Sequence, residues 1–312
     1  MKNKKVIVTT TINEPTKATL EYCKKVDWDF IIVGDTKTPH ESYTSLSKEY
    51  SQLIYLHPDE QELLYPELSQ VLGWKTIQRR NIGFVHAYKL GYEIMATVDD
   101  DNIPYDNWGV DIKVHNIIET DIYTTENIVF DPLSPTKYSN LWHRGFPIQL
   151  LKYRNLIQYS GKDKIKVFIQ ANLWDGDPDI DAICRLSNSP MVKFDPDIKP
   201  YSSSCEFIPF NSQNTILSTL ILKHYFMFPF IGRMDDIWGG YILQHFIGSG
   251  NIIFDKPTVY QERNTQDLIK NLNDEIFGYR NTLELLNNIN NFESYLPIKS
   301  LEAFKIYQSY FN

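Results

Sequence analysis

Short β-branched runs alternate with a helical pattern at the start of the chain. Residues 5–11, "KVIVTTT", predict a strand, and the following "PTKATLEYCKKV" predicts a helix with proline in its first turn. A second strand is predicted at residues 29–35, "DFIIVGD". A right-handed β-α-β unit places both strand ends, Thr9–Thr11 and Gly34–Asp35, along one carboxyl edge of a parallel sheet, where open α/β sheets bind ligands.

A similar pattern continues up to residue 102. "LIYLHPDE" predicts a short strand, residues 74–93 predict a helix that Gly91 ends, and "EIMATV" at residues 93–98 predicts another strand. This last strand carries three consecutive aspartates, Asp99–Asp101, to the same edge. Residues 1–102 therefore predict a nucleotide-binding half.

Strands and helices mix in the remainder of the chain. Strands are predicted within residues 121–133, 166–174 and 251–263, a helix from about Asp235 to Phe246, and two C-terminal helices at about 265–290 and 299–311. No internal repeat or low-complexity linker divides the sequence. We expect an α/β fold, a Rossmann-like mixed sheet flanked by helices, with a domain at 1–262 made of halves 1–102 and 103–262, and a helical extension at 263–312.

Composition narrows the function classes. The net charge of −8 and the absence of a Lys/Arg-rich stripe argue against nucleic acid as a partner. Cys23, Cys184 and Cys205 have no C-x-x-C spacing, which predicts neither a disulfide framework nor a thiolate zinc site and favours a reducing, cytoplasmic location. The start of the chain lacks a secretory apolar region, and the most apolar stretch, "ILSTLILKHYFMFPFIG", carries Lys223, His224 and Pro229, so we expect a soluble protein with no transmembrane segment.

The aspartate triplet is the main candidate site. An acidic triplet alone is commonly a solvated loop. At the end of a buried strand, however, alternate side chains point to opposite sides, so Asp99 and Asp101 would face the same point. Carboxylates are the ligands that Mn²⁺ or Mg²⁺ favour, and these ions keep positions open for substrate phosphates. Because neither a P-loop nor a G-x-G-x-x-G motif occurs, a metal held by a D-x-D pair that grips a nucleotide diphosphate is the economical hypothesis.

Several stretches together resemble known families. "TTTINEPTKA", "WDFIIVGDTKTP", "RRNIGFVHAYKLGYEIMATVDDDN", "RGFPIQ" and "PFNSQNT" resemble the STELLO-type glycosyltransferases, whose fold is the nucleotide-sugar (GT-A) α/β fold. "LWHRGFP", "NLWDGDPDIDAICRL" and "IGRMDDIWGGYI" are similar to the reversibly glycosylated polypeptides, the UDP-arabinopyranose mutases, which share that fold. The likeness runs in consistent order from residue 9 to about 245 and does not cover the tail beyond about 262.

The resemblance implies roles for the first half of the chain. Asp99 and Asp101 match the metal-binding aspartates, and Asp100 would touch the ribose or the sugar. Thr10 and Asp35 fall where the fold usually contacts the base and ribose. Arg80 stands where a guanidinium would reach the diphosphate or sugar through its paired donors, the alternative being a surface position.

The pair Asp235-Asp236 has two interpretations. Carboxylates at a helix start are ordinary caps that the helix dipole favours. The resemblance instead makes one of them a sugar contact and the other a base that takes a proton from an attacking hydroxyl. We favour Asp236 as the base and Asp235 as the sugar contact.

Arg144 matches the arginine that the mutases transiently glycosylate. Because a guanidinium stays protonated in proteins, such a role needs a strongly acidic neighbourhood, which "DGDPDID" at residues 175–181 could supply. The alternative is that Arg144 pairs with a carboxylate or phosphate. Gly145 departs from the mutase pattern, which has an acidic residue there, and this weighs against covalent chemistry.

The remaining candidates are a histidine and the tryptophans. His245 could complete a metal shell, although a histidine at such a position more often packs. Trp174 is expected at the sugar site, and Trp108, Trp142 and Trp238 could also stack on a sugar face, although packing in the core is the commoner fate of tryptophan.

Three functions follow from these residues. The preferred hypothesis is a metal-dependent glycosyltransferase with a UDP-sugar donor, a carbohydrate or glycoconjugate acceptor, and Mn²⁺ or Mg²⁺ as cofactor. The alternatives are a UDP-sugar pyranose/furanose mutase with Arg144 holding or bonding the sugar, and a non-catalytic nucleotide-sugar-binding protein.

Overall fold

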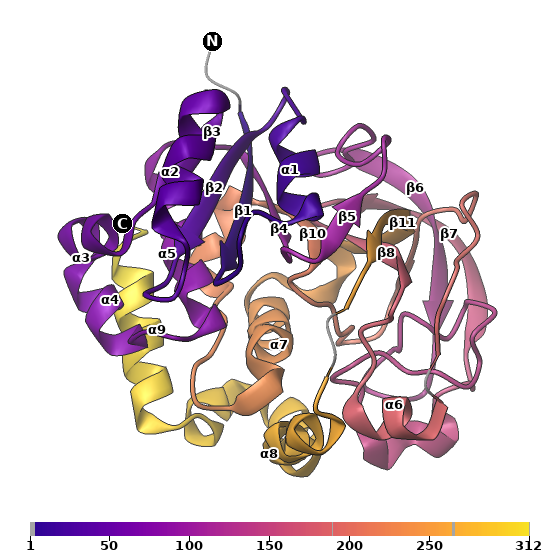
Figure 1. Ribbon diagram of the computed structural model, residues 1–312. Helices are drawn as coiled ribbons and strands as arrows, with labels where there is room; N and C mark the ends of the chain where they lie inside the picture. The colour runs from indigo at the N-terminus through magenta and orange to yellow at the C-terminus, as the bar shows by residue number, and fades with distance from the viewer. Residues whose placement is uncertain (1–3, 189, 264–265, 312) are drawn as a thin grey trace.

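One mixed sheet runs through the computed structural model, which describes residues 4–188, 190–263 and 266–311. In spatial order its strands are β3-β2-β1-β4-β10-β8-β11-β9-β6-β7, with β5 pairing β11 (Figure 1). Their bounds are β1 Lys5–Thr11, β2 Asp29–Gly34, β3 Leu53–Leu56, β4 Ile94–Val98, β5 Asn102–Pro104, β6 Ile117–Thr124, β7 Gln158–Lys166, β8 Ile169–Gly176, β9 Tyr201–Ser203, β10 Asn214–Ser218 and β11 Ile252–Gln261.

Strand direction changes once the sheet passes β4. Strands β3, β2, β1 and β4 are parallel, β10 is antiparallel to both β4 and β8, and β8 is parallel to β11. The parallel set therefore brings the ends of β1, β2 and β4 to one edge, as the sequence predicts. The predicted mixed α/β sheet flanked by helices is confirmed.

Helices cover the sheet and the ends of its strands. Their bounds are α1 Lys17–Cys23, α2 His40–Glu49, α3 Pro58–Leu64, α4 Pro66–Leu72, α5 Arg80–Lys89, α6 Ala182–Asn188, α7 Asp235–Ile247, α8 Leu268–Asn287 and α9 Ile298–Ser309. Figure 1 shows α9 beside α4 at one side of the molecule and α7 near its centre. No helix in the described part of the chain combines the length and apolar character that a membrane span requires.

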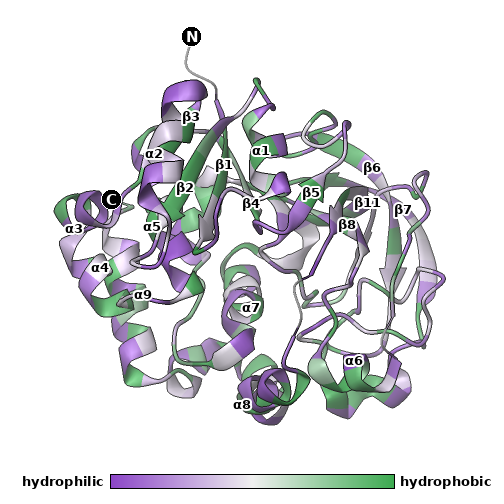
Figure 2. Ribbon diagram, viewed as in Figure 1, coloured by the Kyte–Doolittle hydropathy of each residue, from purple (hydrophilic) through white to green (hydrophobic). Residues whose placement is uncertain are grey.

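The sheet separates two apolar cores because side chains alternate along each strand. Val6 and Val8 of β1 belong to one cluster, and Ile7 between them belongs to the other. The same alternation divides β2, where Phe30 and Ile32 lie opposite Ile31 and Val33. Figure 2 shows these central strands as hydrophobic. Burial on both faces explains why the strands of the first half read as nearly continuous apolar runs.

Several predicted bounds need correction. The helix expected at residues 74–93 is α5 preceded by the 3-10 turn η1 (Ile77–Arg79), because Lys75 adopts a φ of 64° that a helix does not accommodate. The strand expected at 121–133 ends at Thr124, and residues beyond it form irregular structure. Strand β7 is missed by the sequence pattern because most of its side chains are exposed and polar.

The two predicted C-terminal helices are confirmed as α8 and α9. The predicted start at Thr265 lies outside the described residues. The end of the chain packs against both halves: Tyr310, just after α9, contacts Tyr65 of the first half with ring centroids 5.5 Å apart, and Phe304 of α9 lies 5.6 Å from Phe226 of the second. These contacts bury the apolar face of the tail.

Candidate functional site

The ends of β1 and β4 lie next to one another at the carboxyl edge. The Thr11 hydroxyl donates to Asp100 Oδ2 at 2.5 Å, and Asn13 Nδ2 donates to the same oxygen at 2.9 Å. The Thr9 hydroxyl donates to the Val98 carbonyl at 2.8 Å. The edge predicted to bind a ligand is therefore lined by hydroxyl, amide and carboxylate groups.

A first cavity of about 280 Å³, the edge cavity, opens beside these strand ends. Its lining includes Thr10, Asp35 and Asp100, three residues that the sequence places at the nucleotide. Asp35 is buried, and its carboxylate accepts from the backbone N–H groups of Lys75 (2.7 Å) and Thr76 (3.2 Å). Asp35 thereby fixes the loop that forms one wall of the edge cavity.

A second cavity of about 330 Å³, the acidic cavity, lies on the other side of the aspartate triplet. Asp99 and Asp101 line it, whereas Asp100 lines the edge cavity. The triplet thus presents Asp99 and Asp101 to one cavity and Asp100 to the other, as predicted, although these residues form a turn between β4 and β5 and do not continue the strand. Ile77 lines both cavities, so the two are neighbours.

Asp101 is the least satisfied group at the edge. Its Oδ1 is buried and has no hydrogen-bond partner in the structure. Burial, followed by the charges of Asp99 and Asp100, raises the pKa of Asp101 to about 7. The side chain of Asp99 is 28% exposed and accepts from Arg80 at 2.7 Å. The strand end therefore concentrates negative charge that its own neighbours only partly offset.

These residues fit a hard divalent cation. A buried carboxylate oxygen without a partner, next to a second carboxylate on the same cavity wall, is a donor set that Mg²⁺ or Mn²⁺ accepts. No group of three or more His, Cys, Asp or Glu side chains able to hold a metal occurs among the described residues. A cation here would take Asp99 and Asp101 from the protein and complete its coordination with water and phosphate oxygens.

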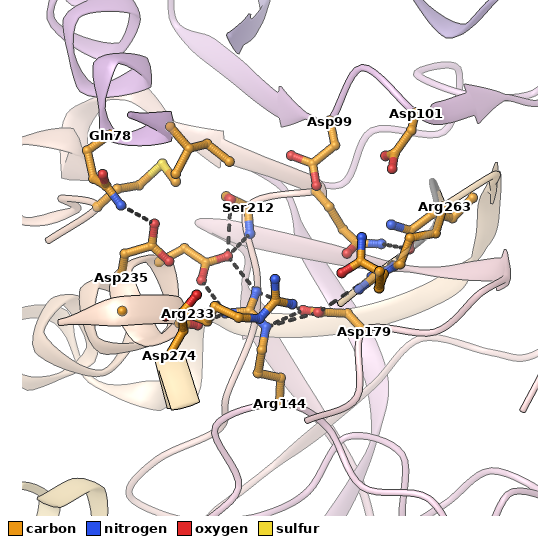
Figure 3. A pocket seen from close by; sticks show the side chains of 17 residues that line it. Gln78, Asp99, Asp101, Arg144, Asp179, Ser212, Arg233, Asp235, Arg263 and Asp274 are labelled. Atoms are coloured by element: carbon orange, nitrogen blue, oxygen red, sulfur yellow. Dashed lines mark hydrogen bonds and ion pairs between the residues drawn. The ribbon is translucent and has the colours of Figure 1, made fainter. Parts of the chain in front are cut away.

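Arg144 crosses the floor of the acidic cavity between two buried carboxylates (Figure 3). Its Nε donates to both oxygens of Asp179 at 2.9 and 3.1 Å, and its Nη1 donates to Asp236 Oδ1 at 2.9 Å. Nη1 also donates to the Arg233 carbonyl, and Nη2 donates to both carboxylates at 2.9 and 3.2 Å. Every nitrogen of the guanidinium donates a hydrogen bond, so Arg144 pairs with carboxylates, which is the alternative given above. One of these carboxylates, Asp179, comes from the predicted acidic segment 175–181.

The backbone conformation and packing at position 145 explain why this chain has Gly145 where the mutases have an acidic residue. Its φ is +93°, and an added Cβ would lie 2.2 Å from Ile237 Cγ2. A side chain at this position would therefore need both a strained backbone and a rearranged α7. No acidic group can stand at position 145 without moving that helix.

Asp235 and Asp236 differ in their surroundings although both start α7. Asp236 faces Arg144 and accepts from the Ser212 backbone N–H at 2.9 Å. Burial acts to raise the pKa of Asp236, but the Arg144 charge and the hydrogen bonds from Arg144 and Ser212 together lower it. The Asp235 carboxylate accepts from Gln78 Nε2 at 2.6 Å, and burial followed by the Asp236 charge raises the pKa of Asp235 to about 7. The expected assignment of Asp236 as the base does not suit these surroundings, because a carboxylate locked in an ion pair is a weak proton acceptor, whereas Asp235 is poised near neutrality.

Arg80 is neither on the surface nor free to reach a ligand. Its side chain is 1% exposed and donates to Asp99 at 2.7 Å and to the Ser212 carbonyl at 3.1 Å. It positions Asp99 and connects this aspartate to the loop before β10. A direct contact from Arg80 to a diphosphate would require Asp99 to give up this ion pair.

The aromatic and histidine candidates lie away from both cavities. Trp174 is 1% exposed and packs against Phe194 with ring centroids 6.3 Å apart, so it offers no ring face to a sugar. Trp108 and Trp238 are likewise in the core, and Trp142 donates to Asp181 at 2.5 Å. His245 lies ten residues after Asp235 on α7, about 15 Å along the axis. Its ring packs at a tilt against Phe246, with centroids 5.1 Å apart, so packing is its role here.

Several lining residues are missed by the sequence, and three of them bear on the chemistry of the site. Arg263 lies two residues after β11, its side chain is 7% exposed, and it approaches Asp177 at 3.4 Å and Asp179 at 3.8 Å. Gln78 and Ser212 fix the two aspartates of α7. The sequence signal for Arg263 is its place just after the last strand, at the same sheet edge, and Ser212 lies within the quoted "PFNSQNT".

Comparisons with known proteins give weak likenesses only. No protein-family model matches the sequence, and no curated protein matches it at a significant level. Among solved structures, a glucosyl-3-phosphoglycerate synthase from Mycobacterium tuberculosis in complex with Mn²⁺, UDP-glucose and phosphoglyceric acid is 11% identical with a TM-score of 0.44, over 91% of this chain and 79% of that chain. A structure described as a mycobacterial protein is 13% identical with a TM-score of 0.46, over 90% and 74%. At these values the likeness establishes neither the fold family nor the activity of this chain.

Proposed function

We propose that this chain is a metal-dependent glycosyltransferase of the GT-A type that uses a nucleotide-diphosphate sugar, with a UDP-sugar as the expected donor. The observation that carries the proposal is the division of the aspartate triplet between two neighbouring cavities. Asp100 stands with Thr10 and Asp35 at the edge cavity, and Asp99 and Asp101 stand at the acidic cavity, with a buried Asp101 oxygen left without a partner. A nucleoside on one side and a sugar on the other would place the diphosphate at the triplet.

The roles follow from the surroundings of each group. Asp99 and Asp101 would hold Mn²⁺ or Mg²⁺, and the cation supplies Lewis-acid stabilisation of the departing diphosphate, worth several kcal/mol. Arg263, whose carboxylate partners lie at 3.4 and 3.8 Å, is the cavity's most loosely held guanidinium toward that diphosphate. Asp235 takes the proton of the attacking hydroxyl.

Arg144 then acts as a positioning residue. It holds Asp179 and Asp236 in place through charge-assisted hydrogen bonds on both sides of its guanidinium. Asp236 in turn orders the loop before β10 by accepting from the Ser212 backbone and hydroxyl, at 2.9 and 3.1 Å. This network gives the acidic cavity a rigid floor.

The surroundings of Arg144 weigh against the mutase alternative. A nucleophilic guanidinium must lose a proton, but Asp179 and Asp236 raise the pKa of Arg144 well above its ordinary value despite complete burial. All three nitrogens also donate hydrogen bonds, so none presents a lone pair to a sugar carbon. The transferase hypothesis needs no such deprotonation.

The direct test is a panel of UDP-sugars with Mn²⁺ or with EDTA. We expect one donor to raise the melting temperature only with the metal, by an amount that corresponds to about 2.7 kcal/mol at a hundredfold excess over Kd. The same donor should release UDP when an acceptor is supplied. A ring-isomerised donor formed without UDP release would replace the transferase with the mutase, and binding without turnover on any acceptor would favour the non-catalytic alternative.

A further inference from the structure

The acidic cavity carries more negative than positive charge in its lining. Three arginines line it, namely Arg144, Arg233 and Arg263. Six carboxylates line the same volume: Asp99, Asp101, Asp179, Asp235, Asp236 and Asp274. With every group ionised, the lining holds three surplus negative charges.

Each of the three guanidiniums already pairs with at least one carboxylate. Arg144 is shared between Asp179 and Asp236. Arg233 donates to the buried carboxylate of Glu275 at 2.9 Å. Arg263 is the most loosely paired, and the proposed donor diphosphate would take it.

Charged groups just behind the lining do not reverse the sign. Asp177 and Glu275 add two negative charges, and the cations that pair with this set, Arg80, Arg185 and Lys270, add three positive ones. Two negative charges remain. A divalent cation at the triplet would offset both, and the donor diphosphate would bring negative charge back.

We infer that the acceptor of this enzyme presents its hydroxyl on an uncharged polyhydroxyl group, with no phosphate or carboxylate near the reacting atom. The inference rests on the proposed function and specifies its acceptor. An anionic acceptor would enter a cavity whose remaining charge repels it and whose cations are already engaged. An uncharged acceptor would instead meet the amide side chains of Gln78, Gln213 and Gln266, which donate to and accept from hydroxyl groups.

Asp274 offers a way to change the charge without touching the proposed machinery. It stands at the rim of the acidic cavity on α8, its side chain is 37% exposed, and it pairs with Lys270 at 2.8 Å. Glu284 lies on the same helix, is exposed, and does not line the cavity. Asp274→Lys and Glu284→Lys therefore change the net charge equally, but only the first changes it at the cavity.

The test titrates glycerol 3-phosphate and 3-phosphoglycerate into the full chain, with and without Mn²⁺ and UDP, by calorimetry. We expect no saturable binding of either anion up to about 10 mM in the wild type or in Glu284→Lys. In Asp274→Lys we expect saturable binding at least about tenfold stronger than that limit. Saturable binding to the wild type at the same cavity, or equal behaviour of the two variants, would overturn the inference. If Asp274→Lys does not fold, Asp274→Asn supplies a smaller change in the same direction.

Turnover adds a second comparison that does not depend on the titration. For an acceptor that accelerates UDP release, we expect its phosphorylated counterpart to have a kcat/KM at least about tenfold lower. An equal or higher value for the phosphorylated acceptor would contradict the inference. Failure of UDP to bind in the presence of Mn²⁺ would refute the proposed function instead. The titration of the cavity with anions alone would still show whether the cavity repels them.

Discussion

Removing the guanidinium of Arg144 is the sharpest perturbation of the cavity floor. The three charged side chains of this cluster are 9%, 2% and 4% exposed for Arg144, Asp179 and Asp236. In Arg144→Met two buried carboxylates lose their shared partner. Breaking a buried ion pair from one side costs about 3–5 kcal/mol. We expect a loss of this size in the free energy of unfolding.

The pH dependence identifies the cause of that loss. In the wild type the pKa values of Asp179 and Asp236 are lowered in the folded state, so their stabilisation is present above about pH 3.9 and is lost as the pH falls through the folded values. In Arg144→Met burial raises them instead, so the variant loses stability as the pH rises above about 3.9. The difference in the free energy of unfolding between wild type and Arg144→Met should therefore grow with pH, by up to about 1.4 kcal/mol for each pH unit and each carboxylate.

Urea unfolding followed by tryptophan fluorescence at several pH values between about 4.5 and 7.5 measures this difference. Arg280→Met is the matched control, because Arg280 is exposed on α8, and it should change the free energy by no more than about 0.5 kcal/mol. Adding Asp179→Asn and Asp236→Asn to Arg144→Met should recover a large part of the loss. A loss in Arg144→Met no larger than in the control, or one that is independent of pH, would refute the ion-pair account.

Two further predictions concern the start of α7. Asp235→Asn should lower the rate of sugar transfer by about 10²–10⁴-fold while UDP binding stays near normal. The wild-type rate should fall as the pH drops through about 7, because Asp235 becomes protonated. A pH–rate profile of the variant that keeps this fall at low pH would contradict the role of Asp235 as the base. Gly232→Ala should lower the free energy of unfolding by more than about 1 kcal/mol, since Gly232 has a φ of +67° and an added Cβ would lie 1.9 Å from the Asp274 carbonyl oxygen. Gly250→Ala is the control in the same urea assay, because an added Cβ there meets nothing within 4 Å.

The sequence predicts the edge of the sheet well because the determinants there are local. β-Branched runs mark β1, β2 and β4, and parallel topology then brings their ends together. The predicted separation of Asp99 and Asp101 from Asp100 is also found, but a turn between β4 and β5 produces it, whereas the sequence pattern suggests an extended strand. The acidic partner of Arg144 is likewise found in the predicted segment.

The sequence fails where packing between distant segments decides. Asp236 differs from Asp235 largely because Arg144, 92 residues away, donates hydrogen bonds to Asp236 and none to Asp235. Trp174 is misplaced because every residue of β8 is buried, so residue type does not tell which side chains face a cavity. Arg80 is predicted to reach the diphosphate but pairs with Asp99, because α5 packs against β1 and β2 and directs this side chain beneath the end of β4. Arg263 is missed by the sequence for the same reason.

Calorimetric titration of UDP in the presence of Mn²⁺ shows whether Asp99 and Asp101 bind UDP through a divalent cation. Asp101→Asn is compared with Asp106→Asn, an exposed aspartate a few residues farther along the chain. We expect Asp101→Asn or EDTA to weaken UDP binding by more than the roughly 10–100-fold that changes in outer-shell partners of metals cost, while Asp106→Asn binds UDP as the wild type does. Unchanged UDP affinity in Asp101→Asn, or in the wild type with EDTA, would contradict it.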